Sequence, residues 1–370
     1  MNNNKYYYEI DILRGIACLL VFFYHFPIYR VLGSDALNLC SGLAGVYAFF
    51  IISGFIITKT FGQQLIKIDN FDLDNWYNAF IQNREQIFLF WYRRFLRLFP
   101  AMFLLFCCAF ILTLKFGIEN NEILKAIVTF FRFILTLMLL GDPFENSIAS
   151  GINHFVERSI GVTWSLTYEI LFYLIFPCII IFKNFLRILL AFLAISFITR
   201  YQHLLCYSAF SIGVLLGVYH DRIKINMLLL NVLTIANLCA LIIGDANGGY
   251  QHRYLFSSAF LIYVAAMQKN ILNFPVIGAV LNFIGIRSYF IYLMHNIINI
   301  IITTIFSVEH FACLYNYIPK LKILVLKDSL TIIHIKHILI LIVTILLADL
   351  FYRFVERPFI EKNRHRASFN

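Results

Sequence analysis

Apolar segments recur along the whole chain and are separated by short polar stretches. Most of them approach or exceed the ~20 residues that a helix needs to cross the ~30 Å hydrocarbon core of a bilayer. This pattern predicts an all-α fold, a polytopic transmembrane helical bundle. The segments lie at roughly residues 10–29, 41–62, 98–116, 123–141, 163–183, 185–200, 203–220, 226–244, 254–269, 284–307 and 332–355.

Basic residues between the segments indicate which ends face the cytoplasm, because cytoplasmic loops carry an excess of Lys and Arg. Such residues gather in 59–97 and again in the tail from Arg353 to Arg366, which places both stretches in the cytoplasm. The pattern predicts about ten crossings with both termini cytoplasmic. The charges require a net odd number of crossings within 98–141, which holds two apolar stretches, so a re-entrant segment fits there.

Composition agrees with a membrane protein, since 61% of the residues are hydrophobic, 14% are charged and the mean hydropathy is +0.79. The formal net charge of +10 follows from basic cytoplasmic loops and requires no nucleic acid. The longest polar stretches, 63–87 and about 308–331, are too short for a separate soluble domain. We therefore expect a single integral-membrane domain over residues 1–370, with its core at about 9–358 and no appended soluble domain.

The eight cysteines lie mostly in apolar segments and form no C-x-x-C pair. Free cysteine behaves as a small buried hydrophobe in such surroundings. We expect neither a disulfide framework nor a metal site from them.

The first apolar segment carries three ionisable residues, Asp11, Arg14 and His25. Ionisable side chains at membrane depth are costly and usually face the bundle interior or a watery cavity. The eleven-residue spacing of Arg14 and His25 puts them on nearly the same helical face, roughly 16 Å apart along the axis. A long ligand lying along the helix could reach both. Snorkelling of Arg14 and a hydrogen-bonded interior His25 explain the same residues equally well.

The second segment contains Ser53 and Gly54 among aromatic residues. Small residues there allow a helix or a ligand to approach closely. Helix packing alone is the simpler interpretation of this pair.

Arg94 and Arg97, three residues apart and followed by Pro100, share one helical face. Guanidinium groups suit phosphates, because their planar forks donate two parallel hydrogen bonds. A positive anchor at the cytoplasmic surface is the alternative interpretation, with comparable support.

The segment from Thr163 to Tyr173 places Trp164, Ser165, Glu169 and Tyr173 near one helical face. An unpaired carboxylate inside the membrane is expensive, so Glu169 is expected to have a partner or to be protonated.

The segment that begins near residue 284 aligns Ser288, Tyr292 and His295 at i, i+4 and i+7. This second polar stripe in an apolar helix predicts a role at the same kind of interior site.

Together these motifs resemble the acyltransferase-3 family, the bacterial membrane-bound O-acyltransferases of surface glycans. The resemblance covers about residues 9 to 358, and the five motifs occur in the family's order. Ile12 departs from the Gly that many members carry after the Asp. The matching positions are Arg14 and His25 (Arg-x10-His), Phe50, Ile52, Ser53, Gly54 and Phe55 (F-x-I-S-G-F), Arg94, Arg97 and Pro100 (R-x-x-R-x-x-P), Thr163 to Tyr173 (T-W-S-L with Glu and Tyr), and Ser288, Tyr289 and His295.

The resemblance implies transfer of an acyl group, usually acetyl, from cytoplasmic acyl-CoA to a glycan hydroxyl, with acetyl-CoA as donor substrate and no metal. The expected catalytic residues are His25 as base, supported by Glu169 and Asp11; a covalent acyl-His25 intermediate stays open. The residues expected to bind the donor are Arg14, Ser53, Arg94 and Arg97. The residues expected to bind the acceptor are Trp164, Tyr173, Ser288, Tyr292 and His295.

The expected partners are acyl-CoA, a glycan or lipid-linked saccharide acceptor and membrane lipids, without nucleic acid; a homo-oligomer is left open. The expected location is the bacterial cytoplasmic (inner) membrane, in a multi-pass arrangement. Lipopolysaccharide O-antigen and exopolysaccharide both remain as acceptors. A proton-coupled transporter or an acyl exporter would use the same interior Arg, His and Glu groups, and a lipid- or glycan-flipping protein is a further alternative.

Overall fold

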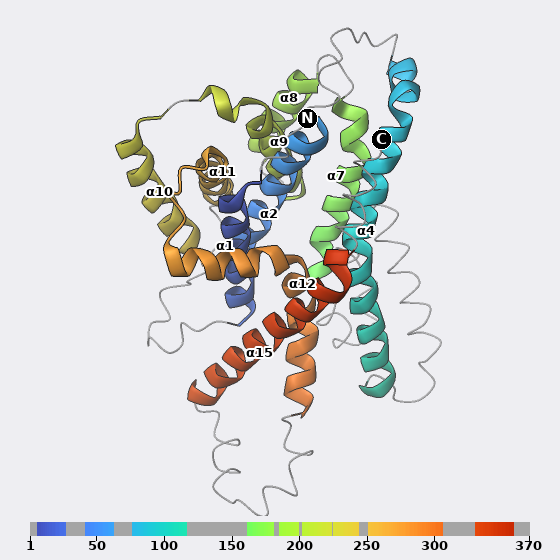
Figure 1. Cartoon of the computed structure of the whole chain (residues 1–370), viewed down its shortest axis with the longest axis vertical. Coiled ribbons are helices and arrows are strands. Elements are labelled where there is room, and N and C mark those ends of the chain that lie inside the picture. Colours follow the sequence, from blue (N-terminus) through green and yellow to red (C-terminus); the bar gives the residue numbers. More distant parts are fainter. Residues whose placement is uncertain are drawn as a thin grey trace, which may run out of the picture. The chain divides into compact units, whose positions relative to one another are not determined.

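The computed structural model describes residues 6–26, 41–62, 76–116, 161–180, 185–199, 202–223, 225–243, 251–305 and 330–358. These residues are almost entirely helical and include no extended strand, as the hydropathy pattern predicts (Figure 1). The helices are α1 (Tyr8–His25), α2 (Gly42–Ile57) with the π-helix η2 (Thr58–Gly62), α4 (Trp76–Phe116), η5 (Gly161–Thr163), α7 (Trp164–Ile180), α8 (Phe185–Thr199), α9 (Gln202–Tyr219), η6 (His220–Arg222), α10 (Met227–Ile242), α11 (Gln251–Met267), α12 (Pro275–Ile305), α15 (Leu330–Phe351) and η7 (Tyr352–Glu356).

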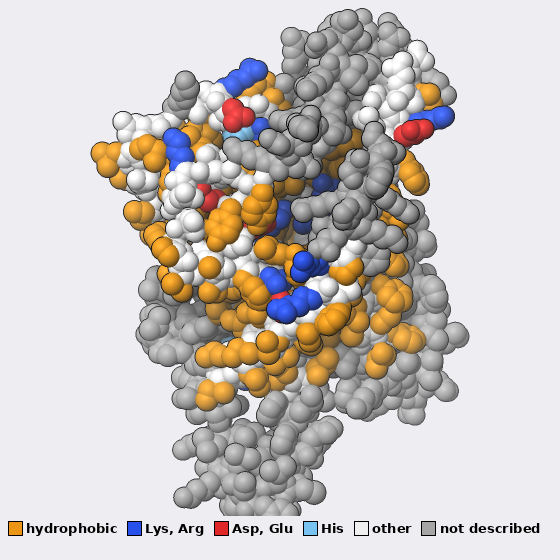
Figure 2. All heavy atoms as spheres, viewed as in Figure 1, with side chains coloured by type: hydrophobic (Ala, Val, Ile, Leu, Met, Phe, Trp, Pro, Cys, Tyr) orange, Lys and Arg blue, Asp and Glu red, His pale blue; other side chains and the backbone are white. Residues whose placement is uncertain are grey.

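Among the described residues, six helical stretches are long and apolar enough to cross a membrane. They are Gly42–Gly62, Phe80–Ile111, Gly161–Ile180, His203–Arg222, Pro275–Thr303 and Ile335–Glu356. Apolar side chains also make up much of the described surface in Figure 2. The predicted all-α fold is thereby confirmed for the described residues, and the six stretches support a multi-pass membrane protein. The crossing number of about ten and the cytoplasmic termini stay predictions, and the apolar segment 123–141 lies outside the described residues.

Helix α4 corrects one predicted boundary. The charges of 59–97 suggested a polar stretch ending at the apolar segment 98–116, but α4 is continuous from Trp76 to Phe116. Arg94 and Arg97 therefore lie inside a stretch that can cross a membrane. Pro100 does not end this helix, because a proline removes only one hydrogen bond and packing can offset that loss.

The chain divides into two compact units, each built from separate stretches of sequence. Unit 1 comprises Met1–Tyr24, Asn38–Arg97 and Tyr168–Ile286, and unit 2 comprises His25–Leu37, Leu98–Thr167 and Arg287–Asn370. Helices α1, α4, α7 and α12 contribute residues to both units. Each unit buries its own apolar side chains, such as Phe55 and Phe210 in unit 1 and Leu293 in unit 2.

Glycines set the close helix packing of unit 1. A Cβ at Gly54 of α2 would collide with the backbone oxygen of Phe210 in α9, and one at Gly213 would collide with that of Ile51. A Cβ at Gly15 of α1 would likewise collide with the backbone of Leu281 in α12. Helix packing is therefore the structural role of Gly54 and Gly15, as small residues in membrane helices often show.

The start of α1 is tied to the turn between α11 and α12. The Glu9 carboxylate, only 1% exposed, accepts backbone N–H bonds from Asn270 (2.7 Å) and Leu272 (3.0 Å). Asn270 adopts a left-handed φ of 59°, which turns its amide within this short connection. The carboxylate thus fixes the first turn of α1, which carries Asp11 and leads to Arg14.

Candidate active site

On α1, Asp11 and Arg14 form an ion pair one helical turn apart. Arg14 Nη1 donates to Asp11 Oδ1 at 2.7 Å, and the side chains are 18% and 9% exposed, respectively. Because one carboxylate oxygen holds one edge of the guanidinium, the pair orients Arg14 within the helix surface. The ion pair positions Arg14, and the predicted catalytic role of Asp11 stays a prediction.

Unit 1 contains a polar cluster that joins α2 to α7. Ser53 Oγ lies 2.9 Å from Tyr173 Oη and donates to Glu169 Oε1 at 3.4 Å. Tyr173 also donates its hydroxyl to Glu169 Oε1, one turn earlier in the same helix. Glu169 therefore has the partners that its place in an apolar helix requires, and we call these three residues with Arg94 the Glu169 cluster.

Arg94 completes this cluster from α4. Its guanidinium carbon lies 5.4 Å from the ring centroid of Phe90 and 5.5 Å from that of Tyr173. A cation held over aromatic rings at this distance is stabilised by their negative faces. Arg94 is half-buried, whereas Arg97 is exposed. The two arginines, predicted as one phosphate-binding pair, therefore occupy different environments, and Arg94 lies over the ring of Tyr173, whose hydroxyl bonds Glu169.

Unit 2 brings together His25 and His295. Their ring centroids are 5.0 Å apart with the planes tilted by 43°. His295 is 1% exposed, and its Nδ1 lies 3.2 Å from the carbonyl oxygen of Ile291. A carbonyl only accepts, so Nδ1 carries a proton and donates it to this bond. His25, by contrast, is exposed at the end of α1 and accessible to a substrate.

Tyr292 anchors the same unit to the start of α7. Its hydroxyl lies 2.8 Å from Ser165 Oγ and donates to the carbonyl oxygen of Val162 at 3.0 Å. Both side chains are buried, and the Tyr292 ring lies 6.3 Å from that of His295. Through these bonds Tyr292 joins α12, which also carries His295, to the start of α7. Ser288 is buried in α12 and Trp164 is half-buried at the start of α7, where both stay predictions as acceptor-binding residues.

Some polar residues of the apolar helices were not singled out from the sequence. Arg287 donates from Nε (2.8 Å) and Nη2 (2.6 Å) to Asp349 Oδ1, and Arg353 pairs with the other oxygen of Asp349 at 2.8 Å. His337 lies with its ring centroid 5.4 Å from Phe26, which in turn contacts His295. The rule that intramembrane ionisable residues carry function could have flagged all of them. The Arg353–Asp349 pair has the i,i+4 spacing that a sequence shows, whereas the pairing of Arg287 with Asp349 and the approach of Phe26 to His337 join distant segments and have no sequence signal.

The sequence of this chain is similar to those of known O-acetyltransferases. The O-acetyltransferase OatA of Staphylococcus aureus (strain NCTC 8325 / PS 47) is 26% identical over 410 residues, covering 100% of this chain and 60% of the relative. The peptidoglycan O-acetyltransferase OatA of Listeria monocytogenes is 30% identical over 189 residues, covering 48% of this chain and 25% of the relative. The chain thus spans only part of the length of these relatives, 60% of the first and 25% of the second. No solved structure matches this chain.

A family model described as an acyltransferase domain, that of acyltransferase family 3, matches residues 7–353. This range agrees with the core that the five motifs predicted. The chain therefore belongs to the acyltransferase-3 family.

Proposed function

We propose that this chain transfers an acetyl group from cytoplasmic acetyl-CoA to a hydroxyl of a cell-envelope glycan. The observation that carries the proposal is the Glu169 cluster, in which a carboxylate, two hydroxyls and a guanidinium meet among apolar helices. Polar groups kept at such a cost in an apolar protein are best explained by a reaction or a bound polar ligand. The names of the two relatives support O-acetyl transfer as that reaction.

His25 serves as the general base in this proposal. It takes the proton of the acceptor hydroxyl as the oxygen attacks the acyl carbon, and it returns the proton to the departing thiolate when the carbon–sulfur bond breaks. Its exposed ring suits contact with a substrate, and the buried His295 beside it limits the orientations that the ring can take. The reaction has no net proton change, so one residue can serve both steps.

Arginines bind the anionic donor in this proposal. Arg97 is exposed on α4 and suits a phosphate, since guanidinium forks bind phosphate oxygens in pairs. Arg14, oriented by Asp11, is a second candidate for the same task. Arg94 instead balances the charge of Glu169, and Ser53 is the hydroxyl that can donate to the thioester oxygen.

The acceptor is a glycan or lipid-linked saccharide at the bacterial cytoplasmic (inner) membrane. Lipopolysaccharide O-antigen and exopolysaccharide are the acceptors expected from the sequence, and the name of the Listeria relative adds peptidoglycan. All three present secondary and primary hydroxyls on sugars, so they require the same chemistry from His25.

The test compares envelope glycans from deletion cells and from cells complemented with wild type or His25→Ala. Proposed transfer predicts O-acetyl NMR signals that disappear on deletion and return only with the wild type. Purified protein should in addition release CoA from acetyl-CoA when glycan fragments are supplied. A transporter would move its solute without consuming acetyl-CoA, and unchanged glycan acetylation in deletion cells would reject the proposal.

A further inference from the structure

Helix α7 contains a proline, Pro177, within its regular course. Proline has no backbone N–H, so the carbonyl four residues earlier loses its helical partner. That carbonyl belongs to Tyr173, whose side chain is buried at 3% exposure. A backbone oxygen in such surroundings needs another donor, because leaving it unpaired costs free energy.

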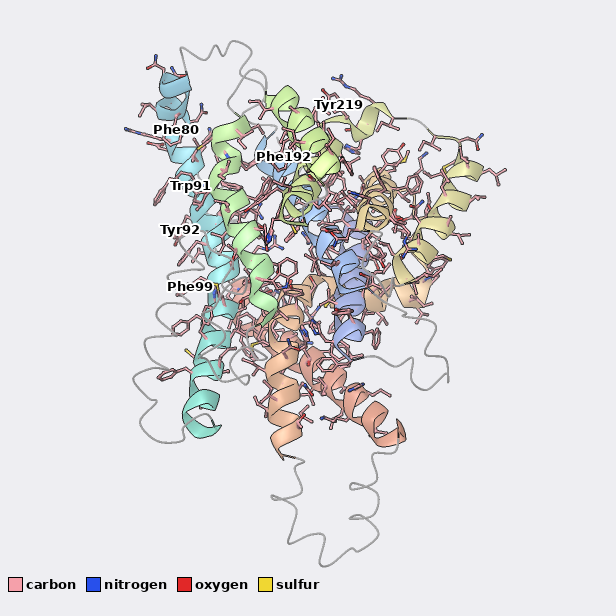
Figure 3. All side chains as sticks on the ribbon, turned by 180° about the vertical axis from the view of Figure 1, so that it is seen from behind. Phe80, Trp91, Tyr92, Phe99, Phe192 and Tyr219 are labelled. Atoms are coloured by element: carbon pink, nitrogen blue, oxygen red, sulfur yellow. The ribbon has the colours of Figure 1, made fainter. Side chains whose placement is uncertain are left out.

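The donor comes from α4. Trp91 Nε1 donates to the carbonyl oxygen of Tyr173 at 3.0 Å, and an indole N–H can only donate. Figure 3 labels Trp91 on α4, the helix that runs beside α7. The indole therefore takes the place of the amide that Pro177 lacks, and it joins two helices of unit 1 at this point.

The acceptor of this bond, Tyr173, is itself a member of the Glu169 cluster. Tyr173 bonds Ser53 and Glu169 through its hydroxyl and receives Trp91 through its carbonyl, so one residue has both ends fixed. Arg94 follows Trp91 by three residues and therefore lies on the same face of α4. The Trp91 bond fixes Tyr173, and the Arg94 guanidinium carbon lies 5.5 Å from the ring centroid of that tyrosine, so the position of the ring also determines the surroundings of Arg94.

We propose that Trp91 is a positioning residue that holds the Glu169 cluster by replacing the hydrogen bond lost at Pro177. Its effect on catalysis rests on the proposed acetyl transfer, but the bond itself does not. The competing explanation is that Trp91 contributes only an aromatic surface to the packing of α4. The two explanations differ in whether the indole N–H matters. A phenylalanine at this position keeps an aromatic surface and loses the N–H, so it separates them.

A double-mutant cycle on the full-length protein in detergent separates them. Trp91→Phe leaves the Tyr173 carbonyl unpaired, so we expect a melting temperature lower by at least about 2 °C. We also expect kcat to fall by about 10- to 100-fold with KM nearly unchanged, as for a displaced reacting group. Pro177→Ala restores a backbone N–H at that position, so adding Trp91→Phe to it should change melting and kcat little. This rescue distinguishes a hydrogen bond from ring packing.

Tyr92→Phe is the matched control, because Tyr92 is an exposed neighbour on the same helix. It should leave melting and kcat unchanged. If Trp91→Phe fails to fold, incorporation of 3-benzothienylalanine at position 91 keeps the shape of the indole and replaces only the N–H. Equal losses from Trp91→Phe with and without Pro177→Ala, or no loss at all, would overturn the proposal. The melting cycle needs no substrate, so an inactive wild type would reject the acetyl transfer and leave the test of this bond intact.

Discussion

Replacing His25 by Ala should abolish turnover and leave the fold intact. The side chain is exposed at the end of α1, so its removal creates no buried cavity. General-base catalysis is typically worth 100- to 10,000-fold in rate, which corresponds to about 2.7–5.4 kcal/mol of transition-state stabilisation. Donor affinity should change little, because the residues predicted to bind the donor are Arg14, Ser53, Arg94 and Arg97 and do not include His25. The assay is acetyl transfer by detergent-purified protein at saturating acetyl-CoA, with melting curves measured alongside.

His295 provides the contrast for this prediction. Its ring is 1% exposed and its Nδ1–H bonds the Ile291 carbonyl, so His295→Ala should lower the free energy of unfolding by about 2–3 kcal/mol. His25→Ala should therefore lower kcat and leave the free energy of unfolding unchanged. His295→Ala should lower the free energy of unfolding. A folded His25→Ala protein that acetylates at the wild-type rate would refute its role as base. If both variants melt at lower temperature than the wild type, both histidines contribute to packing, and the loss of activity in His25→Ala does not report a catalytic base.

Other changes should separate charge from packing. Glu169→Gln keeps both hydroxyl partners but removes the charge beside Arg94, so transfer by the variant in membranes should fall at least about tenfold without loss of folding; wild-type turnover would show that the charge is dispensable. Arg97→Ala should weaken CoA binding by calorimetry about tenfold at unchanged stability, and unchanged affinity would remove it from the donor site. Gly213→Ala should lower detergent melting temperatures strongly, because its Cβ would meet the backbone of Ile51; normal melting would mean that α2 and α9 can separate.

The all-helical fold could be predicted from the sequence because runs of apolar residues mark the helices, whereas the predicted count of about ten crossings stays a prediction. The predicted boundary in α4 was wrong, because the basic residues up to Arg97 were assigned to a cytoplasmic stretch before the apolar segment 98–116, whereas one helix runs through both and through Pro100. The pairing of Glu169 with Tyr173 could be read from the i, i+4 spacing. The approach of Ser53 could not, since 116 residues separate it from Glu169 and helix rotation decides which partner it meets.

The contrast between Arg94 and Arg97 has the same physical origin. Both are arginines on one predicted face of one helix, yet three residues of rotation leave Arg94 half-buried over the ring of Tyr173 and Arg97 exposed. Three steps of 100° bring a helix to within about 60° of a full turn, and that remainder is enough to separate an interior side chain from a surface one. Periodicity fixes the angle between two residues, and only the neighbouring helices fix where the interior begins.

Helix packing and chemistry are also coupled at the Ser53–Gly54 pair, which the sequence left as alternatives. Gly54 allows the backbone of α2 to meet α9 so closely that a Cβ would collide with the Phe210 oxygen. Consecutive residues on a helix point about 100° apart, so fixing Gly54 against α9 also fixes the direction of Ser53. That direction leads to Tyr173 and Glu169. The packing of Gly54 thereby orients the Ser53 side chain, so this short motif serves both helix packing and the polar site.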